Sequence, residues 1–241
     1  MAPQPLEPKP KAILFDLDDT LCDYAAARET RLRIAFTRSI AACSRNGEEI
    51  DIDRMIVDSI NLHPHGADHF PELFSRFGIE APAEALSAAD WYRTNRFHGL
   101  KLFPEVREVV PLVRLRLARS APGAGRPVGI VTNGPAEVQR AKLDLLGIED
   151  LVDFAIVSEE FGLSKPDPEI FHEALRYAGV SASEAVFVGD SPEFDIAGAQ
   201  SADIPSVWVN RYDLAWNSPG PPPTRQIRTL AELPRLLGNE G

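Results

Sequence analysis

Short runs of consecutive apolar residues recur along this chain, separated by segments of mixed polarity. The runs cover residues 13–15, 128–131, 154–157, 186–188 and 207–209. Strands buried on both faces of a parallel sheet are continuous apolar runs, whereas strands with one solvent-facing side alternate apolar and polar residues. Residues 106–117, between the first and second runs, carry an amphipathic helical pattern instead. The chain is therefore expected to be an α/β protein with a Rossmann-like, doubly wound parallel sheet.

Residues 22–102 depart from this arrangement, because their apolar positions recur at helical spacing throughout. On one expected helix the apolar residues are three or four apart: Leu32, Phe36, Ile40 and Cys43. Similar spacing is found at residues 52–60, 70–77 and 83–92, with no strand pattern between them. We expect an all-helical domain of residues 22–102, a candidate lid, inserted into an α/β core of residues 1–21 and 103–241. Residues 1–10 contain four prolines and are expected to be flexible.

Charge and composition reduce the number of possible functions. The chain has 241 residues and a formal net charge of −11, with 44% hydrophobic and 25% charged residues. Its acidic character argues against a surface for nucleic acid or anionic membrane. Cys22 and Cys43 form neither a disulfide framework nor a zinc motif. The first ten residues lack the apolar stretch of a signal peptide, and no run reaches transmembrane length. We expect a cytoplasmic protein; its oligomeric state is left open.

Carboxylates follow two of the apolar runs directly. Asp16 and Asp18 come after the first run, and Asp190 follows the fourth after a glycine. Ligands of open α/β sheets bind outside the carboxyl ends of the strands, so these side chains are expected to meet if the two strands are neighbours. Carboxylates that lie so near to one another do not all ionise unless a cation is also present. A divalent metal is therefore implied, and hard oxygen ligands favour Mg²⁺.

Two further strand-to-helix junctions offer groups that can hold an anion. The Thr-Asn-Gly segment at residues 132–134 precedes an expected helix, and amides at such a helix start, with the threonine hydroxyl, can bind phosphate. Lys165, one of five lysines, stands immediately before another expected helix and can neutralise a phosphate or the acidic cluster. Each feature also has a plainer interpretation, as a simple turn or a solvated surface lysine.

Two other segments resemble functional motifs but are weaker indications of function. Gly123-Ala124-Gly125 precedes a strand rather than opening a helix, so it does not fit a dinucleotide-binding loop, and no P-loop sequence is present. His63, His65 and His69 lie in a segment whose proline and glycine prevent helical presentation of metal ligands. A polar loop between helices is the favoured interpretation, and contact with a substrate is the alternative.

Taken together, four segments resemble the four motifs of the haloacid dehalogenase-like hydrolase superfamily, in order and across nearly the whole chain. They are D-L-D-D-T at 16–20, T-N-G at 132–134, K-P-D-P at 165–168 and G-D-S-P-E-F-D at 189–195. The helical insert after the first motif resembles the C1-type cap of that superfamily. One departure is Asp203, where the family often has glycine. Aspartate tolerates a left-handed helix end better than most residues, so no functional consequence is expected.

The resemblance implies a catalytic role for each motif. Asp16 would be the nucleophile that forms an aspartyl-phosphate, and Asp18 the acid and base for the leaving group and the water. The phosphate would be bound by Thr132, Asn133, Gly134 and Lys165. Mg²⁺ would be held by Asp16, the backbone carbonyl of Asp18, and Asp190. Asp195 would orient Lys165 or a metal-bound water, although a position near a helix start also explains it, and Thr20 would support Asp18.

The second aspartate separates the chemistries known for this superfamily. Dehalogenases typically lack an acid two residues after the nucleophile, so Asp18 favours a phosphate ester. Phosphonate hydrolysis uses a cap lysine, and residues 22–100 contain none. The expected function is a magnesium-dependent phosphatase for a small phosphorylated metabolite. Phosphoglucomutase-like transfer and 2-haloacid dehalogenation remain alternatives, and a non-enzymatic binding module would require a lesion in the motifs that is not found.

Overall fold

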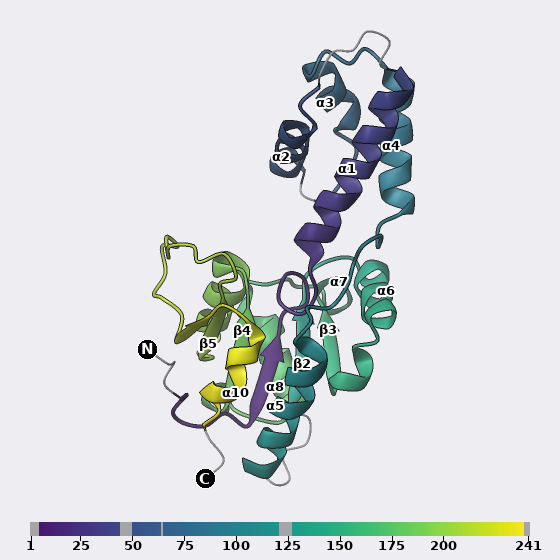
Figure 1. The fold of residues 1–241 in the computed structure, drawn as a ribbon. Helices are drawn as coiled ribbons and strands as arrows, with labels where there is room; N and C mark the ends of the chain where they lie inside the picture. The colour runs from purple at the N-terminus through teal and green to yellow at the C-terminus, as the bar shows by residue number, and fades with distance from the viewer. Residues whose placement is uncertain (1–4, 44–49, 64, 121–126, 239–241) are drawn as a thin grey trace. The chain divides into compact units, whose positions relative to one another are not determined.

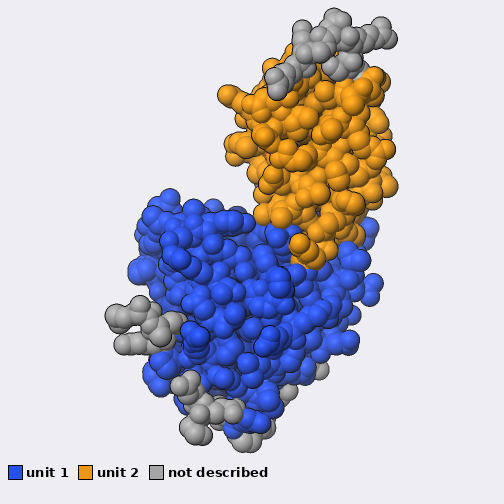
Figure 2. Space-filling view, viewed as in Figure 1, with its two compact units in different colours: residues 1–23, 102–241 blue, residues 24–101 orange. Residues whose placement is uncertain are grey.

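The computed structural model describes residues 5–43, 50–63, 65–120 and 127–238. The chain divides into two compact units, coloured separately in Figure 2. The core unit is formed by Met1–Asp23 and Leu102–Gly241, and the helical unit by Tyr24–Lys101. Cys22 and Leu102 both belong to the core unit and pair through an antiparallel bridge. The segment at residues 123–125 and the first four residues lie outside the described residues.

A six-stranded sheet forms the centre of the core unit (Figure 1). Its strands are β1 (Ala12–Phe15), β2 (Val128–Thr132), β3 (Phe154–Val157), β4 (Ala185–Gly189), β5 (Ser206–Val209) and β6 (Arg225–Ile227). Their order is β3-β2-β1-β4-β5-β6, and every pair is parallel. The expectation of a doubly wound, Rossmann-like parallel sheet is confirmed.

Burial explains the continuous apolar runs. Every residue of β1, β2, β4 and β5 is buried, so a polar side chain within these strands would lose its water. The connecting elements are α5 (Val106–Ser120), α6 (Ala136–Leu146), α7 (Ser158–Phe161), α8 (Pro168–Ala178), α9 (Ala197–Ser201) and α10 (Leu233–Leu236), with short turns η1 (Glu149–Leu151), η2 (Ala182–Glu184), η3 (Pro192–Ile196) and η4 (Leu230–Glu232). Phe171 of α8 packs edge-to-face on Phe187 of β4, with ring centroids 5.0 Å apart.

Two residues at helix ends have the left-handed backbone conformation, and both are residue types that tolerate it. Gly147 ends α6 in the left-handed conformation that glycine adopts without strain. Asp203, which stands where the family often has glycine, has φ of 57°. The expectation that aspartate would tolerate a left-handed helix end is therefore confirmed.

The helical unit contains four helices in its described residues. They are α1 (Tyr24–Cys43), α2 (Ile52–Leu62), α3 (Phe70–Arg76) and α4 (Pro82–Thr94). Aromatic rings fill its core, where Phe36 lies edge-on to Phe70 at 4.9 Å and Phe70 to Tyr92 at 5.6 Å. These contacts give the helical unit a hydrophobic core of its own, as a separate domain requires.

The three histidines of this unit have different environments. His63 and His65 are exposed, as expected for a polar loop, and His65 lies 3.4 Å from the Tyr24 hydroxyl. His69 is buried, with its Nε2 2.7 Å from Ser59 Oγ, and burial lowers its pKa. All three histidines lie between α2 and α3, as the loop interpretation expects, but the turn into α3 carries the His69 ring into the core. Among the helices of the described residues, none is long and apolar enough to cross a membrane.

Candidate active site

The pairing of β1 with β4 brings the first and last motifs together. Phe15 is in register with Val188, and the Asp16 N–H donates to the Val188 carbonyl at 2.9 Å. Asp16 and Asp190 therefore leave neighbouring strands at the same edge of the sheet. This is the carboxyl edge, where parallel α/β sheets bind their ligands.

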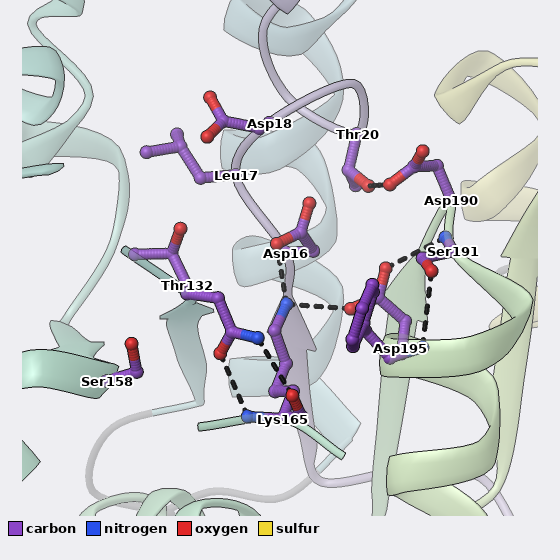
Figure 3. Close-up of polar contacts among 12 residues, drawn as sticks. Asp16, Leu17, Asp18, Thr20, Thr132, Ser158, Lys165, Asp190, Ser191 and Asp195 are labelled. Carbon is purple, nitrogen blue, oxygen red and sulfur yellow. Dashed lines mark hydrogen bonds and ion pairs between the residues drawn. The ribbon is translucent and has the colours of Figure 1, made fainter. Parts of the chain in front are cut away.

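Lys165 lies at the centre of the candidate site (Figure 3). Its ammonium donates to Asp16 Oδ1 at 2.6 Å and to Asp195 Oδ1 at 2.7 Å. The residue is only 3% exposed, so the surface-lysine interpretation is excluded. Burial by itself would lower the pKa of Lys165, but Asp16 and Asp195 outweigh it and raise the pKa above its ordinary value. Lys165 therefore stays charged inside the protein.

Three carboxylates, two of which accept from this ammonium, lie close enough together to share one cation. One oxygen from each of Asp16, Asp190 and Asp195 lies within 4.8 Å of the others. Burial raises the pKa of Asp16 to about 7, with Asp195 and Asp18 adding to the rise and Lys165 opposing it. Burial also raises the pKa of Asp190 to about 9, with Asp195, Asp16 and Asp19 adding to it. Both shifts have the direction expected of buried acids that lack enough positive charge.

The charge count indicates what would balance the cluster. When ionised, the three carboxylates contribute −3 and Lys165 contributes +1, which leaves −2. A divalent cation supplies the missing charge, and an all-oxygen donor set suits a hard metal ion. The residues present therefore fit a metal site.

Asp195 is held on both sides of its carboxylate. Besides accepting from Lys165, it accepts from the Ser191 N–H through Oδ2 at 3.0 Å. It lies within the η3 turn after β4, and it is 1% exposed. A carboxylate near a helix start needs no such partners, so the helix-dipole interpretation does not account for this geometry. Asp195 can orient Lys165 as well as face a metal ion.

The Asp18 carboxylate points elsewhere. In Figure 3, Asp18 and Asp190 lie on opposite sides of the chain segment that follows β1. Asp18 Oδ2 accepts from Lys142 Nζ at 2.6 Å and from Gln139 Nε2 at 3.2 Å, both on α6. Its side chain therefore does not join the three clustered carboxylates. Neither Lys142 nor Gln139 was singled out from the sequence. Their i, i+3 spacing places them on one face of the helix after Thr-Asn-Gly, but only the fold brings that face to Asp18.

The Thr-Asn-Gly segment is placed beside Lys165, but several of its groups already have partners. Asn133 Nδ2 donates to the Lys165 carbonyl at 2.8 Å, and the Lys165 N–H donates to Asn133 Oδ1 at 2.9 Å. The Gly134 N–H donates to Ser158 Oγ at 3.0 Å. The Asn133 side chain therefore holds the lysine loop in place. A phosphate oxygen would have to replace Ser158 as the acceptor for Gly134.

Thr132 is the group of this segment that faces the site with a hydroxyl. Its Oγ1 accepts from Gln139 Nε2 at 3.0 Å, which leaves the hydroxyl proton to donate to an acceptor. In Figure 3, Thr132 lies to the left of the Lys165 side chain, and Asp16 lies above the Lys165 ammonium. Thr132 can therefore serve as a donor to an anion placed near Asp16.

Thr20 is held by residues that lie far from it in the sequence. Thr20 Oγ1 donates to Asp190 Oδ1 at 3.4 Å, so it contacts Asp190 rather than Asp18. Its carbonyl accepts from Arg211 Nη2 at 3.2 Å, and Arg211 Nη1 is paired with Glu105 at 2.9 Å. The expected support of Asp18 by Thr20 is replaced by support of Asp190. Arg211 was not singled out from sequence, because only the fold brings residue 211 to residue 20.

The core unit is a parallel α/β sheet with clustered carboxylates and a buried lysine at its carboxyl edge, a set of side chains with the chemistry to hold a cation. The family model of haloacid dehalogenase-like hydrolases matches residues 10–203 of the chain. The chain therefore belongs to this family, and the resemblance drawn from its four motifs is confirmed.

Individual relatives cover most of the chain. The glyceraldehyde 3-phosphate phosphatase of Methanopyrus kandleri is 35% identical over 207 residues, covering 83% of this chain and 84% of that protein. A HAD phosphatase structure from Thermococcus onnurineus has 29% identity and a TM-score of 0.63, covering 95% and 98% of the two chains. A 2-haloacid dehalogenase structure from Pseudomonas syringae pv. Tomato DC3000 has 32% identity and a TM-score of 0.56, with the same coverage.

Proposed function

We propose that this protein is a magnesium-dependent phosphatase that hydrolyses a small phosphorylated metabolite through an aspartyl-phosphate on Asp16. The enzyme class, a phosphoric monoester hydrolase, agrees with its family and with the phosphatases among its relatives. The observation that carries the proposal is the buried Lys165 ammonium, which contacts Asp16 while Asp190 and Asp195 complete a group of carboxylates within 4.8 Å.

The metal would be held by Asp16, Asp190 and the backbone carbonyl of Asp18, with Asp195 orienting Lys165. When bound, Mg²⁺ offsets negative charge so that an anionic carboxylate and an anionic phosphate ester can approach each other. The net −2 charge of the cluster and its oxygen donors support this assignment.

In the first half-reaction, an Asp16 oxygen attacks phosphorus while the bond from phosphorus to the ester oxygen breaks. Asp18, in its protonated form, transfers its proton to that departing oxygen, so the product leaves as an alcohol. The Asp18 carboxyl faces away from the Lys165 cluster, which separates the acid from the nucleophile. Thr132 and Lys165 donate to the phosphoryl oxygens as negative charge redistributes among them.

In the second half-reaction, Asp18 accepts a proton from a water molecule, whose oxygen attacks the phosphorus of the aspartyl-phosphate. The bond from Asp16 to phosphorus breaks, inorganic phosphate leaves, and the Asp16 carboxylate is restored. Asp18 has then regained the proton that it gave to the leaving group, so the cycle balances. Net reaction consumes one ester and one water.

We assign substrate selection to the helical unit, residues 24–101, acting as a cap. A separately packed helical unit inserted directly after the nucleophile motif supports this role. The relative from Methanopyrus kandleri acts, by its name, on glyceraldehyde 3-phosphate. That compound belongs in the test panel together with phosphoglycolate, sugar phosphates, nucleoside monophosphates and acylneuraminate phosphates.

The test is a phosphate-release screen over this panel with Mg²⁺, in parallel with Asp16→Asn. We expect turnover that EDTA abolishes and Mg²⁺ restores, and no turnover for the variant. Acid-quenched protein should carry phosphate on Asp16. Hydroxylamine should release this phosphate, because it cleaves acyl phosphates. Halide release from 2-haloacids without phosphate release would favour the dehalogenase alternative, and phosphate moved between positions of a sugar without release would favour transfer.

A further inference from the structure

Helix α6 places two buried polar side chains on one oxygen of Asp18. Lys142 is 4% exposed and Gln139 is 2% exposed, and both donate to Asp18 Oδ2. A buried lysine is uncommon unless its charge is compensated, and the 2.6 Å salt bridge to Asp18 compensates this one. Neither residue belongs to the four motifs.

Gln139 also connects this contact to the phosphate-binding segment. Its Nε2 lies 3.0 Å from Thr132 Oγ1 and 2.5 Å from the Asn133 carbonyl, in addition to 3.2 Å from Asp18. The same helix therefore fixes Asp18 and Thr132 relative to each other. Catalytic groups lose much of their effect when misplaced by about 1 Å, so a shared rigid support matters for the reaction.

We propose that Lys142, assisted by Gln139, is a positioning residue that holds the Asp18 carboxyl in the orientation from which it exchanges protons with the leaving group and the water. This inference rests on the proposed function and deepens it. Without the two donors, Asp18 could rotate toward solvent, because its side chain is 25% exposed. Lys142 does not touch the substrate in this role; it acts through Asp18.

The first test is Lys142→Met, measured on aryl and alkyl phosphates whose leaving groups span a range of basicity. We compare kcat/KM, which reports only the steps up to departure of the leaving group, because the later attack of water is the same for every ester. We expect kcat/KM to fall about 10- to 100-fold for basic leaving groups and much less for 4-nitrophenyl phosphate. Two controls should keep wild-type kinetics. Lys11→Met removes an exposed lysine paired with Glu184. Arg140→Met changes a residue of α6, the helix that carries Lys142, and removes its ion pair with Glu160 of α7. A loss of equal size for all leaving groups would overturn the proposal.

The second test is a double-mutant cycle with Asp18→Asn. If Lys142 acts through Asp18, Lys142→Met should change kcat of the Asp18→Asn enzyme by less than about twofold, whereas independent roles would multiply. The same cycle on the free energy of unfolding measures the contact without any turnover, and additive effects there would also overturn the proposal. Should Lys142→Met fail to fold, Gln139→Met removes the second donor and carries the same test.

Failure of this proposal and failure of the proposed function give different results. A wild-type protein that releases phosphate from no ester defeats the proposed function. An active wild type with an unaffected Lys142→Met variant defeats only the positioning role.

Discussion

Gly189, the last residue of β4, is where a single methyl group should disturb the site most directly. A Cβ added there would lie 2.4 Å from Asp195 Oδ2 and 2.5 Å from Asp195 Cγ, well inside van der Waals contact. Asp195 is buried and held by Lys165 and the Ser191 N–H, so it cannot turn aside freely. Gly189→Ala should therefore displace Asp195 and, with it, Lys165.

The size of the effect follows from opposing terms. Replacing a strand glycine by alanine would by itself stabilise the protein by about 0.5–1 kcal/mol. Overpacking a buried site costs about 1–3 kcal/mol, and losing one charge-assisted hydrogen bond of Asp195 costs about 1.5–3 kcal/mol more. The unfavourable terms win, and we expect a net destabilisation of about 2–5 kcal/mol.

Urea unfolding of the variant and the wild type, with and without Mg²⁺, measures this difference, and phosphate release measures its effect on turnover. Gly66→Ala is the matched control, because no atom of the described residues lies within 4 Å of a Cβ added there, and its stability should stay within about 0.5 kcal/mol of wild type. A Gly189→Ala protein that is as stable and active as wild type would refute the packing of Asp195 against Gly189.

Three more outcomes are expected. Lys165→Met leaves Asp16 and Asp195 buried without their cation, so urea unfolding should show a loss of about 3–5 kcal/mol together with lost turnover; unchanged stability would contradict the ion pairs. Asn133→Ala removes both hydrogen bonds to the Lys165 backbone and should cost about 1–3 kcal/mol in the same assay, whereas a neutral effect would mean that the loop holds itself. With EDTA, the folded protein keeps protons on Asp16 and Asp190 that the unfolded chain releases above its carboxyl pKa of 3.8. The contribution of these two groups to stability should therefore fall as pH rises above 3.8, and the fall should end once pH has passed about 7 for Asp16 and about 9 for Asp190. Mg²⁺ should remove that fall, as pH-dependent unfolding of wild type and Asp190→Asn would show; identical profiles with and without Mg²⁺ would count against the metal site.

Much of the fold could be predicted because burial leaves a direct trace in the sequence. The apolar runs at β1, β3 and β5 lie within a residue of the observed strands, since strands buried on both faces of a parallel sheet are mostly apolar. The meeting of Asp16 with Asp190 depended on β1 and β4 being neighbours. Their parallel register satisfies that condition.

Other features could not be predicted, because they depend on which side chain ends near which. Lys142 looked like any helical lysine until α6 placed it against Asp18. Gly134 was expected to offer its amide to phosphate, and Ser158, from a different strand-to-helix junction, already accepts from it. His69 was grouped with two exposed histidines of the same short segment, although the turn into α3 buries it.

The sequence by itself determined the parallel sheet, the helical insert and the identity of the motif residues, because periodicity and strand-end chemistry are local properties. Only the tertiary structure decided how their charges are shared. It assigned Lys165 to Asp16 and Asp195, Lys142 to Asp18, and Thr20 to Asp190. Such pairings are settled by distances of a few ångströms between distant segments, and burial then decides how strongly each charge acts.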